Sequence, residues 1–118
     1  MDALMYHNPR CSKSRQTLAL LDQRGIQPTI VDYLNQPPSV EQLKAVLEML
    51  GMEPRDLMRT KEEAYNAQQL DDPALTNEQL LQAMVKTPVL IERPIVIIDG
   101  RAAIGRPPET VLSLLASS

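Results

Sequence analysis

The sequence has 118 residues, of which 43% are hydrophobic and 23% charged, the length and balance of one ordinary globular domain. Its net charge of -3 argues against a general binder of nucleic acid or of membrane surfaces. No apolar run approaches the roughly 20 residues that span a bilayer, and no basic-then-apolar secretory signal opens the chain. We therefore expect a cytoplasmic protein with neither nucleic acid nor membrane as a partner.

The first part of the chain alternates between strand-like and helix-like segments. Residues 3–6 form a short apolar run that predicts a buried strand, and residues 12–24 carry the leucine spacing of a helix. Residues 29–33 are rich in β-branched side chains and predict a second strand. Ser39-Val-Glu-Gln42 fits a capping box, which predicts that a helix starts there and ends near Gly51.

The middle of the chain, about residues 53–87, shows no strand pattern and predicts a helical insertion. Thr76-Asn-Glu-Gln79 is a second capping box and opens a helix inside it. Asp99-Gly100 is a strong hairpin signal between two apolar runs. Strands are thus expected in three late segments, residues 89–91, 95–98 and 101–104. A last helix, residues 109–115, is expected after two prolines.

The order of these elements predicts the fold. An early strand–helix–strand unit requires a parallel pair of strands, whereas the late hairpin requires an antiparallel pair. A mixed four-stranded sheet flanked by helices accommodates both. We therefore predict an α/β protein of thioredoxin-like architecture, with a helical insertion at about 53–87, in a single domain that spans residues 1–118.

Cys11 is the residue most suited to chemistry, because it lies where the first strand leads into the first helix. Backbone N–H groups at a helix start stabilise negative charge, so they lower the pKa of a thiol placed there. Arg10, Lys13 and Arg15 add positive charge around it. Cysteine is also a common buried apolar residue, but the loop position and the basic neighbours favour a reactive thiol.

The chain contains no second cysteine, and position 14 is Ser14. A disulfide formed during turnover must therefore involve another molecule, such as glutathione or a redoxin. A phosphatase loop of the Cys-x5-Arg type would need arginine where Thr17 stands, and one cysteine with one histidine is too few for a metal site. His7 could either influence the ionisation of the thiol or cap the end of the strand.

Several colinear segments together resemble one bacterial family, the glutaredoxin-coupled arsenate reductases (ArsC). The similarity covers nearly the whole chain, and the family shares the thioredoxin-like fold with a helical insertion. The segments that carry it are His7-Asn-Pro-Arg-Cys-Ser-Lys-Ser-Arg15, Thr29-Ile-Val-Asp-Tyr-Leu-Asn-Gln-Pro-Pro38, Leu57-Met-Arg59, Arg93-Pro-Ile-Val96 and Gly105-Arg-Pro107.

The resemblance implies a role for each of these motifs. Cys11 would attack arsenate and form a covalent arsenic adduct, while Arg59, Arg93 and Arg106 would bind and neutralise the oxyanion. Glutathione, a co-substrate rather than a tightly bound cofactor, would displace the adduct. Glutaredoxin would then reduce the Cys11–glutathione disulfide. The enzyme would act as a monomer and would release arsenite.

Four further residues are expected to support this site. His7, Ser14 and Arg15 belong to the same loop and first helical turn as the cysteine, and Ser14 is expected to make a capping hydrogen bond. Pro94 is expected to follow a cis peptide bond close to the thiol, as in other thioredoxin-like folds. Cis bonds precede only about one proline in twenty, so this expectation is a sharp one.

A second hypothesis belongs to a different class. Relatives of this fold include a regulator that binds RNA polymerase, in which the cysteine at most senses oxidation. That relative usually carries Cys-x-x-Cys, whereas this chain has Ser14 at the second position. The arginines separate the two hypotheses, because a regulator needs no arginines converging on Cys11.

Overall fold

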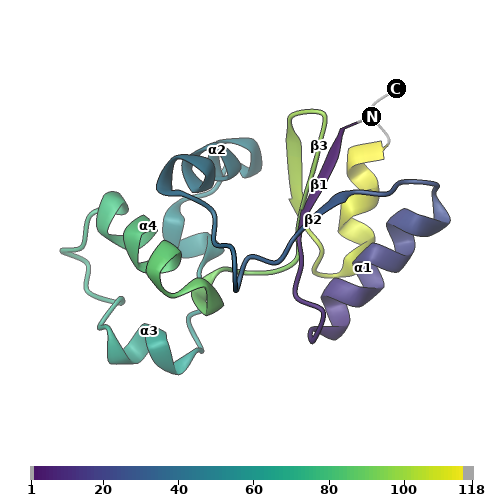
Figure 1. The fold of residues 1–118 in the computed structure, drawn as a ribbon. Coiled ribbons are helices and arrows are strands. Elements are labelled where there is room, and N and C mark those ends of the chain that lie inside the picture. Colours follow the sequence, from purple (N-terminus) through teal and green to yellow (C-terminus); the bar gives the residue numbers. More distant parts are fainter. Residues whose placement is uncertain (1, 116–118) are drawn as a thin grey trace. The chain divides into compact units, whose positions relative to one another are not determined.

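The computed structural model describes residues 2–115, which form two compact units. The sheet unit consists of the residues up to Gln36 together with those from Arg93 onward, and the helical unit consists of Pro37–Glu92. Figure 1 shows the strands and helices of both. Within residues 2–115, none of the helices combines the length and the apolar character that crossing a bilayer requires.

The sheet unit contains four of the five predicted strand segments and two helical elements. The strand order is β2-β1-β3-β4; β1 pairs parallel to β2 and antiparallel to β3, and β3 pairs antiparallel to β4. The predicted mixed α/β sheet is therefore confirmed. Its elements are β1 (Ala3–Tyr6), α1 (Ser12–Gln23), β2 (Thr29–Val31), β3 (Ile95–Ile98), β4 (Arg101–Ile104) and the 3-10 helix η3 (Pro108–Leu115).

The hairpin between β3 and β4 follows directly from its turn residues. Asp99 and Gly100 both have positive φ, 51° and 81°, as a two-residue turn that matches the strand twist requires. Glycine adopts this conformation without steric cost, and aspartate tolerates it better than most residues. The turn sets the register in which Ile98 faces Arg101.

One face of the sheet forms the core of this unit. Alternate residues of the strands meet side chains from α1 and η3, and these two helices lie side by side in Figure 1. Each fully buried aliphatic side chain contributes about 1.5–3 kcal/mol, so this cluster fixes α1 against the strands. The buried members are Met5, Leu21, Val96, Ile98, Ala103, Val111 and Leu114.

The helical unit begins with α2 (Val40–Leu50), and both predicted capping boxes are present in it. Ser39 Oγ accepts from the N–H of Gln42 at 3.1 Å, and the Ser39 N–H donates to Gln42 Oε1 at 2.9 Å; Thr76 and Gln79 make the same pair of bonds. The other elements are η1 (Pro54–Leu57), α3 (Glu63–Ala67), α4 (Asn77–Lys86) and η2 (Pro88–Leu90).

One expectation differs from the structure. The strand expected at residues 89–91 is instead the 3-10 turn η2, followed by a single bridge between Ile91 and Met58. Pro88 opens this turn, because proline lacks an N–H and its φ suits a first helical turn. The helical unit, Pro37–Glu92, contains the predicted insertion and also α2, which packs against α4.

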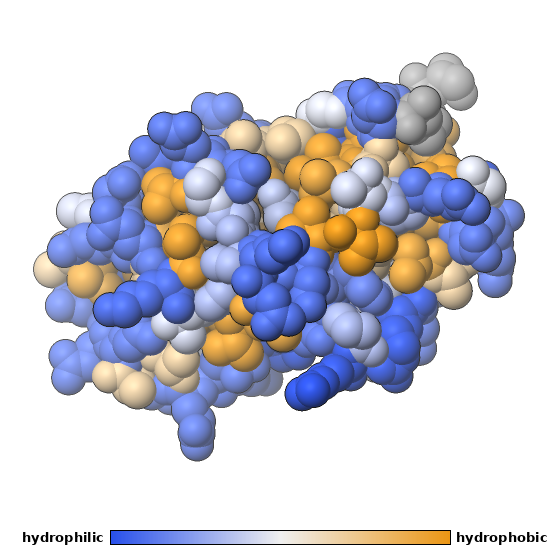
Figure 2. All heavy atoms as spheres, viewed as in Figure 1, coloured by the Kyte–Doolittle hydropathy of each residue, from blue (hydrophilic) through white to orange (hydrophobic). Residues whose placement is uncertain are grey.

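The surface is largely polar. The view in Figure 2 shows hydrophilic side chains with smaller hydrophobic patches between them. Among the described residues, the large hydrophobic side chains that are most exposed are Ile30, at 44%, and Leu34, at 37%. Both belong to the segment that includes β2 and the turn after it.

The capping box of α2 generates a stability prediction. Ser39→Ala removes the acceptor for the Gln42 N–H, so we expect the free energy of unfolding, measured by urea denaturation, to fall by about 1 kcal/mol. Ser39→Asp keeps an acceptor and should unfold at nearly the wild-type urea concentration. Equal losses in the two variants would contradict the capping role.

Candidate functional site

Cys11 occupies the cap position at the start of α1. Its backbone is extended, with φ -93° and ψ 124°, and its carbonyl accepts the N–H of Arg15 at 3.0 Å. On the other side, its own N–H donates to the carbonyl of Asn8 at 3.0 Å, which closes the turn that Asn8-Pro9 predicts. The thiol is therefore held at the end of the helix where the backbone N–H groups are free of intrahelical partners.

Two arginines from the sheet unit reach the sulfur. The Arg106 guanidinium donates through Nη2 to Cys11 Sγ at 3.5 Å, and its Nε donates to the carbonyl of Arg93 at 2.7 Å. The side chain of Arg93 also hydrogen-bonds the Cys11 sulfur. Arg93 and Arg106 thus converge on the thiol, as the family resemblance implies, although they lie far from it along the chain.

The environment of Cys11 favours the thiolate. Burial alone raises its pKa, but the N–H of Ser14, the guanidinium of Arg93 and the N–H of Lys13 outweigh that effect, so the thiol pKa lies below its ordinary value. Each of these donors interacts more strongly with a negative sulfur than with a neutral one. The Cys11 thiol is therefore ionised to a greater extent than that of a free cysteine, and protein N–H groups stabilise its negative charge.

Tyr33 is a part of this site that the sequence does not single out. Burial lowers the pKa of Arg93, but its interactions with Cys11 and with Tyr33 outweigh that effect and raise it. The Tyr33 side chain is almost completely buried, at 1% exposed. No local pattern marks this contact, because it joins the end of one predicted strand to a loop that follows the helical unit.

Close packing behind the sulfur positions the two loops that carry Arg93 and Arg106, which we call the arginine loops. The peptide bond between Arg93 and Pro94 is cis, as predicted, and the bond between Arg106 and Pro107 is cis as well. The Gly105 N–H donates to the Pro94 carbonyl at 2.9 Å. A Cβ on Gly105 would lie 2.8 Å from Pro94 Cγ and closer still to Thr17 Oγ1. Only glycine fits between this proline and α1.

His7 acts on the site through Ser14. His7 Nδ1 and Ser14 Oγ are 2.7 Å apart, and the same oxygen accepts the N–H of Asn8 at 3.1 Å. Burial lowers the pKa of His7, with Asp32 opposing this and Arg15 adding to it, so the ring is neutral at pH 7. The hydroxyl has one proton, which a neutral His7 can accept at Nδ1.

The remaining expected site residues lie apart from the sulfur contacts described above. Arg15 donates from Nη1 to the carbonyl of Pro9 at 2.9 Å, which braces the loop before Cys11. Arg59 belongs to the helical unit, where its guanidinium pairs with Glu62 at 3.1 Å and with Glu92 at 2.9 Å. These carboxylates, which sequence reasoning did not identify, occupy two of its donors. An approach of Arg59 to Cys11 stays a prediction.

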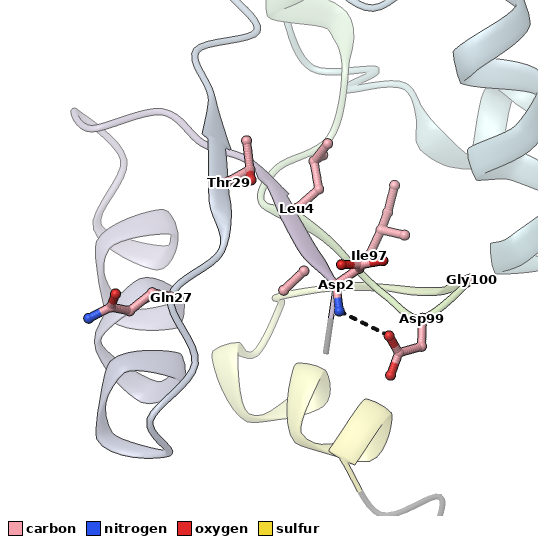
Figure 3. A pocket seen from close by; sticks show the side chains of 8 residues that line it. Asp2, Leu4, Gln27, Thr29, Ile97, Asp99 and Gly100 are labelled. Carbon is pink, nitrogen blue, oxygen red and sulfur yellow. Dashed lines mark hydrogen bonds between the residues drawn. The ribbon is translucent and has the colours of Figure 1, made fainter.

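A cavity of about 590 Å³ lies at the end of the sheet where β1 begins (Figure 3). Its lining includes Leu4, Thr29 and Ile97, and the Asp2 N–H donates to Asp99 Oδ1 at 3.1 Å beside it. Cys11 follows the opposite end of β1. This cavity is therefore separate from the thiol.

Comparison with known proteins gives consistent matches. The family model described as "ArsC family" matches residues 6–114. An arsenate reductase from Haemophilus influenzae is 50% identical over 116 residues, covering 98% of this chain and 100% of the relative. The uncharacterized protein YfgD of Escherichia coli strain K12 is 52% identical over 112 residues, 94% of each chain. The solved structure of an arsenate reductase from Vibrio cholerae is 52% identical, with a TM-score of 0.94, and covers 96% and 97%.

The Arg93 contact generates a prediction about the thiol. Because this guanidinium stabilises the thiolate, Arg93→Gln should raise the pKa of Cys11, and the midpoint of iodoacetamide alkylation should move to higher pH. In the wild type that midpoint should lie below the value of about 8.5 for a free cysteine. A wild-type midpoint at or above that value would contradict thiolate activation, and an unchanged midpoint in Arg93→Gln would remove Arg93 from it.

Gly105 generates a packing prediction. Gly105→Ala forces a methyl group against Pro94 and Thr17, and overpacking of this kind costs about 1–3 kcal/mol. We expect a loss of that size in the free energy of unfolding from urea denaturation. Gly100→Ala adds a methyl group in open space but at positive φ, so it reports backbone strain alone. If Gly105→Ala had the same free energy of unfolding as the wild type, the close packing of Gly105 against Pro94 and Thr17 would contribute nothing to stability, which would contradict this prediction.

Proposed function

The chain belongs to the ArsC family, and we propose that it is an arsenate reductase in which Cys11 is the nucleophile. The observation that carries the proposal is the convergence of Arg93 and Arg106 on a thiol whose pKa is lowered. A buried apolar cysteine does not need two guanidiniums, and a regulator that only senses oxidation does not need them either. The arsenate reductase name of the Haemophilus influenzae relative supports the same assignment.

The arginines answer an electrostatic problem of the reaction. Arsenate is an anion at neutral pH, so a thiolate that approaches it meets repulsion. Guanidiniums offset this repulsion and present paired N–H donors that match the spacing of oxyanion oxygens. Arg93 and Arg106 supply these groups at the sulfur, and the N–H groups at the start of α1 add donors. On the strength of the sequence motif, we assign Arg59 as the third oxyanion ligand.

The first step is nucleophilic substitution at arsenic. The thiolate of Cys11 forms a sulfur–arsenic(V) bond, and one arsenate oxygen leaves as water after it takes up protons. A glutathione thiolate then attacks the Cys11 sulfur. A sulfur–sulfur bond forms, the sulfur–arsenic bond breaks, and its electron pair remains on arsenic, which leaves as arsenite. Arsenic gains two electrons, and the two thiols lose them as a disulfide.

The enzyme is then restored by external thiols. Because Cys11 is the single cysteine of the chain, the Cys11–glutathione disulfide cannot be opened from within. A glutaredoxin thiolate attacks the glutathione sulfur and releases the Cys11 thiolate. The lowered pKa of Cys11 assists here too, because a more stable thiolate is a better leaving group.

The surrounding residues hold this machinery in position. His7 and Asn8 orient Ser14, whose N–H faces the sulfur, and Arg15 braces Pro9 on the other side of the loop. Pro94 packs with Gly105 and orders the two arginine loops. We assign His7, Ser14, Arg15 and Pro94 as positioning residues rather than catalytic ones.

A coupled assay tests the function. The wild type is mixed with arsenate, glutathione, glutaredoxin, glutathione reductase and NADPH, and we expect arsenate-dependent NADPH consumption that Cys11→Ser abolishes. Arg106→Gln should lower kcat/KM for arsenate by about a hundredfold, the usual loss for one oxyanion donor. Arg24→Gln, an exposed arginine after α1 in the same unit, is the matched control and should be unaffected. NADPH consumption that does not depend on Cys11 would contradict the proposal.

A further inference from the structure

A second cavity borders the loop that presents Cys11. It measures about 280 Å³ and lies between the segment just before the cysteine and the turn that follows β2. We call it the Arg10 cavity; its lining residues are Asn8, Pro9, Arg10, Asp32, Leu34 and Asn35. All of them belong to the sheet unit. We propose that the Arg10 cavity binds the γ-glutamyl end of glutathione, which deepens the function proposed above and rests on it.

Both walls of the Arg10 cavity also contact the thiol site. In the first wall, Arg10 precedes Cys11 directly, and the Cys11 N–H donates to the carbonyl of Asn8 at 3.0 Å. In the second wall, Tyr33 lies between Asp32 and Leu34 in the sequence and interacts with Arg93, the arginine that contacts the sulfur. A molecule in this cavity therefore contacts the loop that leads into Cys11, while Cys11, Arg93 and Arg106 themselves are not part of the lining.

The charges of the cavity fit a zwitterion rather than a simple anion. Arg10 supplies a cation and Asp32 an anion, and hydrogen bonds order both sides. The Arg10 N–H donates to Asn8 Oδ1 at 3.0 Å, and Asn35 Nδ2 donates to Asp32 Oδ2 at 2.7 Å. A carboxylate would pair with Arg10, and an ammonium would pair with Asp32. The γ-glutamyl end of glutathione carries these two groups on one carbon, whereas its glycyl end carries only a carboxylate, which Asp32 would repel.

The volume of the Arg10 cavity suits one end of glutathione rather than the whole molecule. Pockets that hold a whole small molecule usually measure about 300–1,000 Å³, and this one falls just below that range. It can enclose one end of an extended tripeptide while the rest lies outside. The cysteine and glycine residues of glutathione then extend out of the cavity, toward the residue that follows Arg10, which is Cys11.

The test uses oxidised glutathione without arsenate, so that its outcome does not depend on arsenate reduction. The Cys11 thiolate attacks one sulfur of the disulfide, forms the Cys11–glutathione disulfide and releases a glutathione thiolate. Intact-protein mass spectrometry gives the rate over a range of oxidised glutathione concentrations. Each rate is divided by the iodoacetamide alkylation rate of the same variant, which removes any change in thiol reactivity.

We expect the wild-type rate to saturate. Arg10→Gln and Asp32→Asn should each raise the half-saturating concentration by about tenfold, the scale of one charge-assisted contact. Arg10→Lys should restore part of the loss, and Arg24→Gln is the matched arginine control. An unchanged half-saturating concentration in Arg10→Gln, or a wild-type rate that never saturates, would overturn the proposal.

Shortened disulfides test which end of glutathione binds. The disulfide of γ-glutamylcysteine should keep the wild-type half-saturating concentration and its dependence on Arg10, whereas the disulfide of cysteinylglycine should lose both. The opposite order would overturn the γ-glutamyl assignment. If the coupled assay showed no arsenate reduction while Arg10-dependent glutathionylation persisted, the arsenate assignment would fail and the glutathione site would stand.

Discussion

The contact between a negative sulfur and two guanidiniums organises the sheet unit. Cys11 stands at the start of α1, where backbone N–H groups lower its pKa, and Arg93 and Arg106 approach it from two loops. Each partner alone is an ordinary feature of proteins. Together they suit the approach of a thiolate to an oxyanion, because the positive charge that stabilises the sulfur would also offset the charge of the substrate that we propose.

Precise packing maintains this contact. Gly105 lies so close to Pro94 and Thr17 that no side chain fits there, and the Arg106 Nε reaches the Arg93 carbonyl at 2.7 Å. The two arginine loops are therefore fixed to each other and to α1. The core on one face of the sheet holds α1 in turn. The positions of the charges thus depend on apolar packing and on one glycine.

Much of this arrangement could be predicted from local patterns, and the rest could not. The strand before Cys11 and the helix after it, the Asp99-Gly100 turn and both capping boxes depend on neighbouring residues, which a sequence displays directly. The Tyr33–Arg93 contact and the pairing of Arg59 with Glu92 join distant segments, so no local pattern reveals them. The prediction of a strand at residues 89–91 was wrong, because Pro88 opens a 3-10 turn despite the β-branched residues around it. Arg93 and Arg106 were identified through the family resemblance, and their sulfur contacts agree with it.

In the reaction that we propose, the single cysteine determines how the cycle is completed, because each turnover would take its second thiol from solution. The proposed reaction therefore depends on one bond, that between the Cys11 sulfur and arsenic. X-ray absorption at the arsenic edge, on protein incubated with arsenate before any glutathione is added, observes this bond directly. We predict a sulfur neighbour around arsenic in the wild type and only oxygen neighbours in Cys11→Ser. Oxygen neighbours alone in the wild type, under conditions where arsenate is bound, would contradict it.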